Sequence, residues 1–194
     1  MSRYRSPRVV IALVMLMAST SFATPATAAP APLTGVGVIL YDIGFGKVPT
    51  LVITGILAED VDLPATVEVP VPGGSTVGWV GEVFGGDQSQ DFVASFTTRA
   101  EDGYDVLEIE VTKSRVVQVE LEPPAGWVVE KGTTADLSMS WIAHQDLPSV
   151  LVGFELDKSI HAENPAPASL ATTVTASGVR YSYETEPVAA GTTL

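Results

Sequence analysis

The sequence predicts an all-β protein, and three observations support this. After residue 30, apolar and polar residues alternate in run after run, no window repeats apolar residues at helical spacing, and turn-forming residues separate the runs. In one of the clearest runs, Leu107, Ile109 and Val111 alternate with Glu108 and Glu110. Such a strand has one apolar and one polar face, as expected where a sheet covers a core on one side only.

Each expected strand is an alternating run bounded by turn residues. The segments 72–74, 101–103, 123–126, 145–148 and 177–178 are rich in Pro, Gly, Asp or Ser, and each lies between two runs. In order along the chain, we expect strands at 36–42, 50–57, 65–71, 76–84, 92–100, 104–112, 115–122, 134–142, 149–156, 169–176 and 179–184.

Short connections without crossover helices predict antiparallel neighbours. The expected fold is therefore an antiparallel two-sheet sandwich of immunoglobulin-like or jelly-roll type, with a closed barrel as the alternative. Strands 104–112 and 115–122 are expected to form a hairpin. Its favoured register sets Glu108 opposite Gln118 rather than Glu120, because like charges directly opposed destabilise a strand pair unless a cation bridges them.

Residues 1–28 have the features of a secretory signal peptide. Three arginines lie among the first eight residues, an apolar run follows at 9–17, and small residues lead to Ala28. We expect cleavage after Ala28, with Ala23 as the alternative. The apolar run is shorter than the roughly 20 residues that a membrane-spanning helix needs. The sequence therefore predicts a secreted, extracellular protein without a membrane anchor.

The remaining chain is long enough for one domain with its own core. We expect a flexible segment at 29–34, a single domain at 35–186 with a connector at 164–168, and a disordered tail at 187–194. The chain contains no Cys, so its stability depends on apolar burial without disulfides.

The charge balance narrows the range of partners. The complete chain has 23 Asp and Glu against 10 Lys and Arg, a formal net charge of −13. Nucleic acids and anionic membranes are disfavoured partners, because affinity for phosphate comes from cationic side chains. Extracellular proteins, glycans and cations remain compatible.

A Gly-Asp-rich loop is the candidate cation site. Asp87, Ser89 and Asp91 place oxygen-bearing side chains at alternate positions, as a calcium loop requires. The loop lacks the later bidentate Glu and the inner Gly of an EF-hand, and an ordinary solvated loop has the same composition. Calcium is the only cofactor that the sequence suggests.

Two histidines are the candidates for acid–base chemistry. His144 and His161 each precede a carboxylate by two residues, at Asp146 and Glu163. A zinc site would need three or four ligands, and thiolates are absent. No Gly-x-Ser-x-Gly motif accompanies the histidines. We therefore identify no catalytic residue.

The three tryptophans are candidates for stacking on sugars. Trp79 and Trp141 lie in alternating runs and are expected in the core. Trp127 follows a Pro-Gly-rich turn and is the better candidate for a surface ligand site.

Three functions are compatible with these features. The first is a secreted, non-catalytic binding or cell-surface interaction module. The second is a secreted hydrolase that uses carboxylates with His144 or His161. The third is a structural protein that assembles by addition of a β-strand to an exposed edge.

Overall fold

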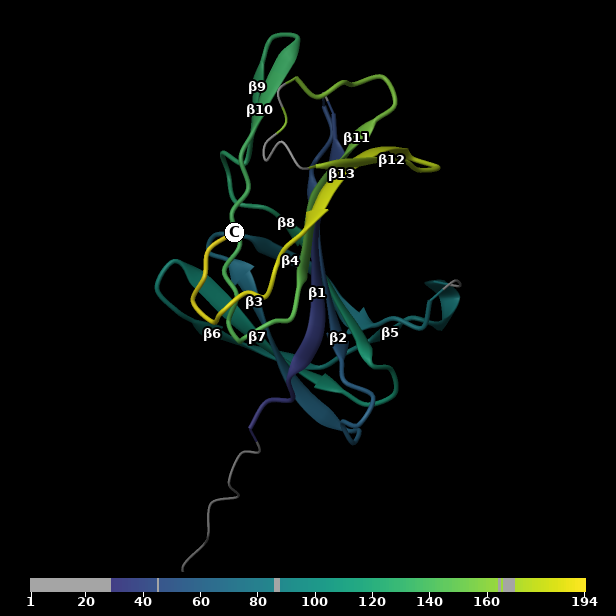
Figure 1. The fold of residues 1–194 in the computed structure, drawn as a ribbon, viewed down its shortest axis with the longest axis vertical. Coiled ribbons are helices and arrows are strands. Elements are labelled where there is room, and N and C mark those ends of the chain that lie inside the picture. The colour runs from purple at the N-terminus through teal and green to yellow at the C-terminus, as the bar shows by residue number, and fades with distance from the viewer. Residues whose placement is uncertain (1–28, 45, 86–87, 164, 166–169) are drawn as a thin grey trace, which may run out of the picture.

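The computed structural model describes most of the chain after residue 28 (Figure 1). The expected signal peptide with its cleavage site at Ala28, the calcium candidate Asp87, and most of the expected connector lie outside the described residues. The described residues are 29–44, 46–85, 88–163, 165 and 170–194.

The described chain is all-β, as the alternating runs predict. Apart from one turn of 3₁₀-helix at Gln88–Gln90, its regular elements are strands, and none of its helices is long and apolar enough to cross a membrane. The strands are β1 (Leu33–Ile43), β2 (Thr50–Leu57), β3 (Ala65–Pro72), β4 (Thr76–Glu82), β5 (Phe92–Val93), β6 (Phe96–Ala100), β7 (Tyr104–Val111), β8 (Val116–Glu122), β9 (Val128–Lys131), β10 (Thr134–Leu137), β11 (Val150–Asp157), β12 (Ala171–Val174) and β13 (Gly178–Glu184).

These strands form three sheets. An eight-stranded sheet has the order β12-β13-β11-β1-β2-β8-β4-β5, a three-stranded sheet has the order β3-β7-β6, and β9 and β10 pair as a hairpin. The large sheet ends at β12 and β5 and does not close on itself, so the described strands form no closed barrel. All pairs are antiparallel except β1 with β11. That pair can be parallel because more than 100 residues separate the two strands and no tight turn has to join them.

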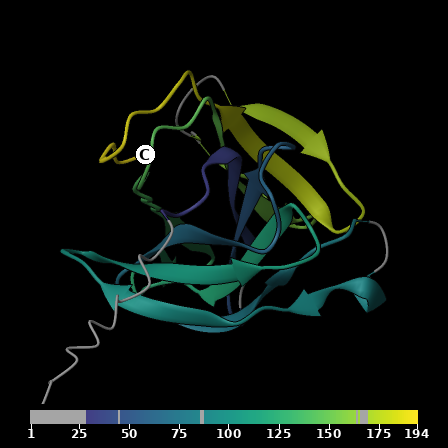
Figure 2. The same ribbon diagram turned by 90° about the horizontal axis from the view of Figure 1, so that it is seen from below.

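The apolar core lies between the large sheet and the three-stranded sheet. Leu40, Leu51 and Ile53 project from the large sheet, and Leu107 and Ile109 project from β7. All five are at most 1% exposed. Burying one such side chain contributes about 1.5–3 kcal/mol. Figure 2 shows the C-terminal strands and the teal strands from the middle of the chain on opposite sides of the molecule.

The expected hairpin between β7 and β8 is wrong. β7 pairs with β3 and β6, whereas β8 pairs with β2 and β4, so the two strands lie in different sheets. Glu108 is opposite Glu68 rather than Gln118. The segment between the two strands crosses from one sheet to the other. The buried carboxylate of Glu82, on β4, binds this segment.

Glu82 is fully buried and holds this crossing through four hydrogen bonds. Its Oε1 accepts from the backbone N–H of Thr112 at 2.9 Å and from the Thr112 hydroxyl at 2.8 Å, and its Oε2 accepts from the N–H groups of Lys113 and Ser114 at 2.6 Å each. Burial opposes ionisation of Glu82, but these bonds outweigh it and lower the pKa of the carboxyl group. A paired, ionised carboxylate thus determines the path from β7 to β8.

Two other expected strands are interrupted. The strand expected at 92–100 splits into β5 and β6, because the N–H of Ala94 bonds the carbonyl of Val80 before the chain enters the other sheet. The strand expected at 134–142 ends at Leu137, and β9 was not expected at all. Beyond Leu137 the chain follows the edge of β3, where the indole N–H of Trp141 donates to the carbonyl of Pro70 at 2.9 Å.

Both ends of the described chain, which include the expected flexible segment and disordered tail, form backbone hydrogen bonds with the fold. Leu33 is 5% exposed at the start of β1, and the N–H of Ala31 donates to the carbonyl of Thr66 at 2.7 Å. In the tail, Val188 is 6% exposed and Leu194 exchanges two backbone hydrogen bonds with Trp141. The tail thus pairs with the loop at 141–147, whereas Ala31 bonds β3.

Of the two tryptophans expected in the core, one is buried there and the other is not. Trp141 is 3% exposed, as expected for a core residue. Trp79 is only half-buried and points outward, because its neighbour Val80 occupies the inward position. A Cβ added at Gly81 would lie 2.3 Å from the Trp79 ring, so the ring covers that glycine on the outer face. The register shift between Val77 and Trp79 exchanges the faces that the sequence alternation predicts.

Candidate functional site

A groove of about 900 Å³ lies between the β9–β10 hairpin and strands β11 and β13. The hairpin stands beside the upper end of β11 in Figure 1. It forms because Lys131 and Thr134 are joined by a tight turn, in which Gly132 has a φ of 65°. The volume is within the range of sites that bind small molecules or peptide segments.

One face of the hairpin forms a wall of this groove. Val128 and Glu130 from β9, and Ala135 and Leu137 from β10, lie on this face and line the groove. Val128 and Leu137 also pack against the core. The end of the hairpin at Val128 and Leu137 is therefore packed against the core, and the end nearer the turn, with Glu130 and Ala135, lines the groove.

The opposite side of the groove is rich in aromatic side chains. Phe154 of β11 and Tyr183 of β13 line it, and both are half-buried. Phe154 stacks on Tyr181 with a centroid distance of 5.1 Å and an angle of 16° between the rings. The stack fixes the Phe154 ring, so an apolar surface is held in place before any ligand arrives.

The charged residues that line the groove are acidic. Glu130, Asp136 and Glu163 contribute carboxylates, and no Lys or Arg is among the described lining residues. Glu130 Oε1 also accepts a bond from the N–H of Gly46 at 3.3 Å, and Asp136 pairs with Lys131 outside the groove lining. The rim is thus suited to a cationic or hydrogen-bond-donating ligand.

The predicted pair His161 and Glu163 lies at this groove. Both side chains are exposed and line it, but among the described residues they form no hydrogen bond with each other. A general base needs a partner that orients it and a nucleophile within hydrogen-bond reach. The structure shows neither for His161 within the described chain.

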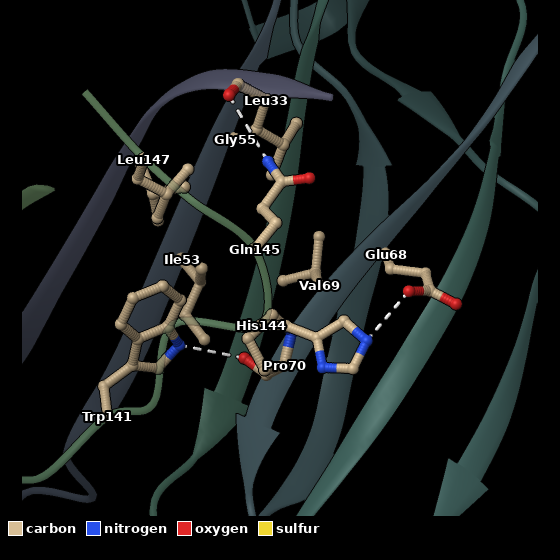
Figure 3. A pocket seen from close by; sticks show the side chains of 11 residues that line it. Leu33, Ile53, Gly55, Glu68, Val69, Pro70, Trp141, His144, Gln145 and Leu147 are labelled. Carbon is tan, nitrogen blue, oxygen red and sulfur yellow. Dashed lines mark hydrogen bonds and ion pairs between the residues drawn. The ribbon is translucent and has the colours of Figure 1, made fainter. Parts of the chain in front are cut away.

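His144 has a different partner from the one its sequence neighbours predict. Its Nε2 lies 2.9 Å from Oε2 of Glu68 (Figure 3). Its Nδ1 lies 3.5 Å from the hydroxyl of Tyr104. The carboxylate of Asp146 instead accepts from the N–H of Ala190 at 2.9 Å. No sequence signal pointed to Glu68, because it lies on β3, far away along the chain.

An arginine links Glu68 of this cluster to other carboxylates on the same three-stranded sheet. Arg99 of β6 contacts Oε1 of Glu68 at 3.1 Å, donates to Glu101 at 2.9 Å and also pairs with Glu108. The hydrogen bond to Glu101, together with those to Glu68, raises the pKa of Arg99. Arg99 is thus the cation that makes the direct opposition of Glu68 and Glu108 tolerable.

The cavity beside His144 is too small for catalysis on a substrate. Its volume is about 10 Å³, enough for at most one water molecule. Leu33, Trp141 and Leu147 line it with the side chains in Figure 3. We interpret the His144 cluster as a structural contact that attaches the 138–149 loop to β3.

The calcium candidate is described only in part. Asp87 lies outside the described residues, and Ser89 is within the 3₁₀ turn. Asp91 closes the loop on itself: its Oδ1 accepts from the N–H of Phe84 at 3.3 Å, and its own N–H donates to the carbonyl of Gln88 at 3.2 Å. In the described ranges no three His, Asp or Glu side chains gather as a metal site would require. Calcium binding stays a prediction.

Trp127 is only partly accessible to a ligand. It is half-buried against the core at the base of the β9–β10 hairpin. Its carbonyl accepts from the N–H of Ser138 at 2.8 Å, which extends the hairpin pairing by one step. Its predicted role in ligand binding is untested, and its position supports the groove wall.

Comparisons with known proteins add no family assignment. No protein-family model matches the sequence, and no curated protein resembles it significantly. The functional interpretation therefore depends on the geometry alone.

Proposed function

We propose that this protein is an exported, non-catalytic binding module, and that the groove between the β9–β10 hairpin and strands β11 and β13 is its ligand site. In this proposal the eight-stranded and three-stranded sheets are the layers of an antiparallel sandwich, as in immunoglobulin-like and jelly-roll domains. The leader expected at 1–28 delivers the domain to the extracellular space, where its partner is a protein or a glycan.

The observation that carries the proposal is the groove itself. It combines about 900 Å³ of open volume with half-buried aromatic rings and a rim of carboxylates. A hydrophobic surface with a few converging polar groups is the usual composition of a ligand site.

The hydrolase alternative has weaker support. The one histidine with a carboxylate partner, His144, adjoins a cavity of about 10 Å³, and His161 lies in the groove without an orienting partner among the described residues. Binding requires only the surface that is present, whereas hydrolysis requires a nucleophile, a base and room for the substrate.

The test is to fill the groove without disturbing the fold. Ala135→Trp places an indole in the groove, and Val129→Trp places the same ring on the opposite face of the same hairpin. The purified chain and both variants are incubated with a polysaccharide panel and with extracellular proteins from culture medium. We expect retention of a ligand by the wild type and by Val129→Trp, and its loss with Ala135→Trp. Equal retention by both variants would show that the groove is not the site.

A further inference from the structure

We propose that the groove binds an extended peptide segment of a partner protein, with alternating basic and apolar residues, and that the segment pairs with β10 as an added strand. This inference rests on the proposed function and names the class of ligand. Its support is the free edge of β10, the apolar side of the groove, and the charge of the rim.

The turn of the β9–β10 hairpin determines which backbone groups are free. Lys131 and Thr134 flank a two-residue turn and form a hydrogen-bonded pair, and the alternation of an antiparallel ladder then places the next such pairs at Asp136 and Ser138. The bond from the N–H of Ser138 to the carbonyl of Trp127, at 2.8 Å, agrees with this phase. The N–H and C=O groups of Ala135 and Leu137 therefore point away from β9.

These groups have no partner among the described residues. β10 pairs only with β9, and no other described hydrogen bond engages the backbone of Ala135 or Leu137. β10 is a short edge strand with donors and acceptors spaced as a second strand would require.

The lining of the groove shows that this edge faces it. The seven consecutive residues 133–139 line the groove. A strand that presented only one face would contribute alternate residues, as β9 does with Val128 and Glu130 but not Val129 or Lys131. The additional contribution of Thr134 and Asp136 from the other face indicates that β10 meets the groove edge-on.

The side chains of an added strand would have two different environments. Residues directed to one side meet Phe154, Tyr183 and Leu137, which favour apolar side chains. Residues directed toward the rim meet Glu130 and Glu163, which favour Lys or Arg. A peptide of alternating basic and apolar residues matches both environments. Its backbone can also pair with the β10 edge, whereas a glycan has no peptide backbone to do so.

The probes are fluorescein-labelled synthetic peptides of about nine residues, a common strand length. One alternates Lys and Val, a second has the same composition in two blocks, and a third alternates Glu and Val. We expect saturable anisotropy with the alternating Lys–Val peptide and binding at least about tenfold weaker with the other two. Equal binding of the alternating and block peptides would overturn the proposal.

Backbone pairing is tested by methylating the peptide amides. One version is N-methylated at the Val residues and another at the Lys residues. In a strand these two sets of amides point to opposite edges, and only one edge can face β10. We expect one version to bind at least about tenfold more weakly than the other. Equal affinities of the two versions would exclude strand addition.

The rim is tested by neutralising its charges. Glu130→Gln with Glu163→Gln should weaken the Lys–Val peptide at least about fivefold and reduce the dependence of binding on salt. The matched control Asp102→Asn with Glu122→Gln removes the same charge away from the groove and should leave binding unchanged. Equal weakening by both pairs would contradict a specific role of the rim.

The outcomes separate this inference from the proposed function. If Ala135→Trp abolishes capture of a ligand but the two N-methylated peptides bind alike, the groove is the site and strand addition is wrong. If the chain instead dimerises and Ala135→Trp, but not Val129→Trp, returns it to monomers, the occupant is a second copy and the partner-peptide inference is overturned.

Discussion

The two halves of the large sheet differ in what covers their inner faces. Along β1, β2 and β8, side chains such as Leu40, Leu51 and Val119 are fully buried in the core cluster that also contains the inward side chains of the three-stranded sheet. Along β11 and β13, Phe154 and Tyr183 meet the groove and are half-buried. One sheet thus supplies both a core and a candidate binding surface, and the difference comes from the opposing layer rather than from the strands themselves.

The largest expected effect contrasts the covered half with the open half. Ile109→Ala removes a fully buried side chain that β7 directs into the core against the covered half, and it should lower the free energy of unfolding by about 2–5 kcal/mol. Tyr183→Ala at the groove should cost less than half as much, because the ring is already partly solvated. Urea unfolding of both variants measures the contrast. Equal losses would show that the groove side is packed as tightly as the core.

The next effect concerns the crossing between the two sheets. Glu82→Gln replaces a carboxylate with an amide that cannot accept all four hydrogen bonds, and it should destabilise the fold by about 3 kcal/mol. The control Glu120→Gln alters a half-buried outer-face carboxylate and should cost under about 0.5 kcal/mol. Chemical denaturation compares the two. Similar values would mean that Glu82 does not hold the crossing.

Acid sensitivity should follow from the two buried carboxylates. Burial opposes ionisation of Glu155, but hydrogen bonds from Ser177, Thr175 and Arg180 lower its pKa, as the bonds described above lower that of Glu82. The usual pKa for both is 4.5. Because the folded-state values lie below it, their stabilisation is complete above that pH and is lost as the pH falls through the lowered values.

The measurement is the free energy of unfolding between about pH 6 and pH 3. Stability of the wild type should fall over this range, and the fall should be shallower in Glu82→Gln, where one of the two groups no longer titrates. An equal slope in the variant would mean that Glu82 titrates alike in the folded and unfolded chain.

The smallest effect is expected on the exposed face of the three-stranded sheet. Arg99→Lys keeps the charge but loses the geometry that reaches Glu68, Glu101 and Glu108 together. The melting temperature should drop slightly at low salt and match the wild type at high salt, because solvent ions screen the exposed carboxylates. A loss of stability independent of salt would indicate packing by Arg99 rather than charge.

Local sequence patterns predicted the strands well and their partners poorly. The strand at 50–57 has the expected bounds, and the alternation of Leu107, Ile109 and Val111 correctly identified an inward face. The same alternation cannot show whether a turn joins neighbours in one sheet or carries the chain to another. For the segment 112–114, the crossing to another sheet is determined by hydrogen bonds to Glu82, which lies on β4, about 30 residues earlier in the chain.

The candidate site shows the same division. The sequence singled out His161 with Glu163, and both line the groove, but the groove exists only because β9–β10 stands opposite β11 and β13. The free edge of β10 was not expected either, because β9 was missed and Thr134–Leu137 was assigned to a longer strand.

By itself, the sequence determined an all-β, cysteine-free chain whose strands each have an apolar and a polar face, because side-chain direction alternates with a period of two along any extended segment. The tertiary structure alone decided which strands pair, which apolar faces are covered, and that β10 and the aromatic strip remain open. Those outcomes depend on contacts between residues far apart in the chain, such as Glu82 with Ser114 and His144 with Glu68, and no local pattern encodes them.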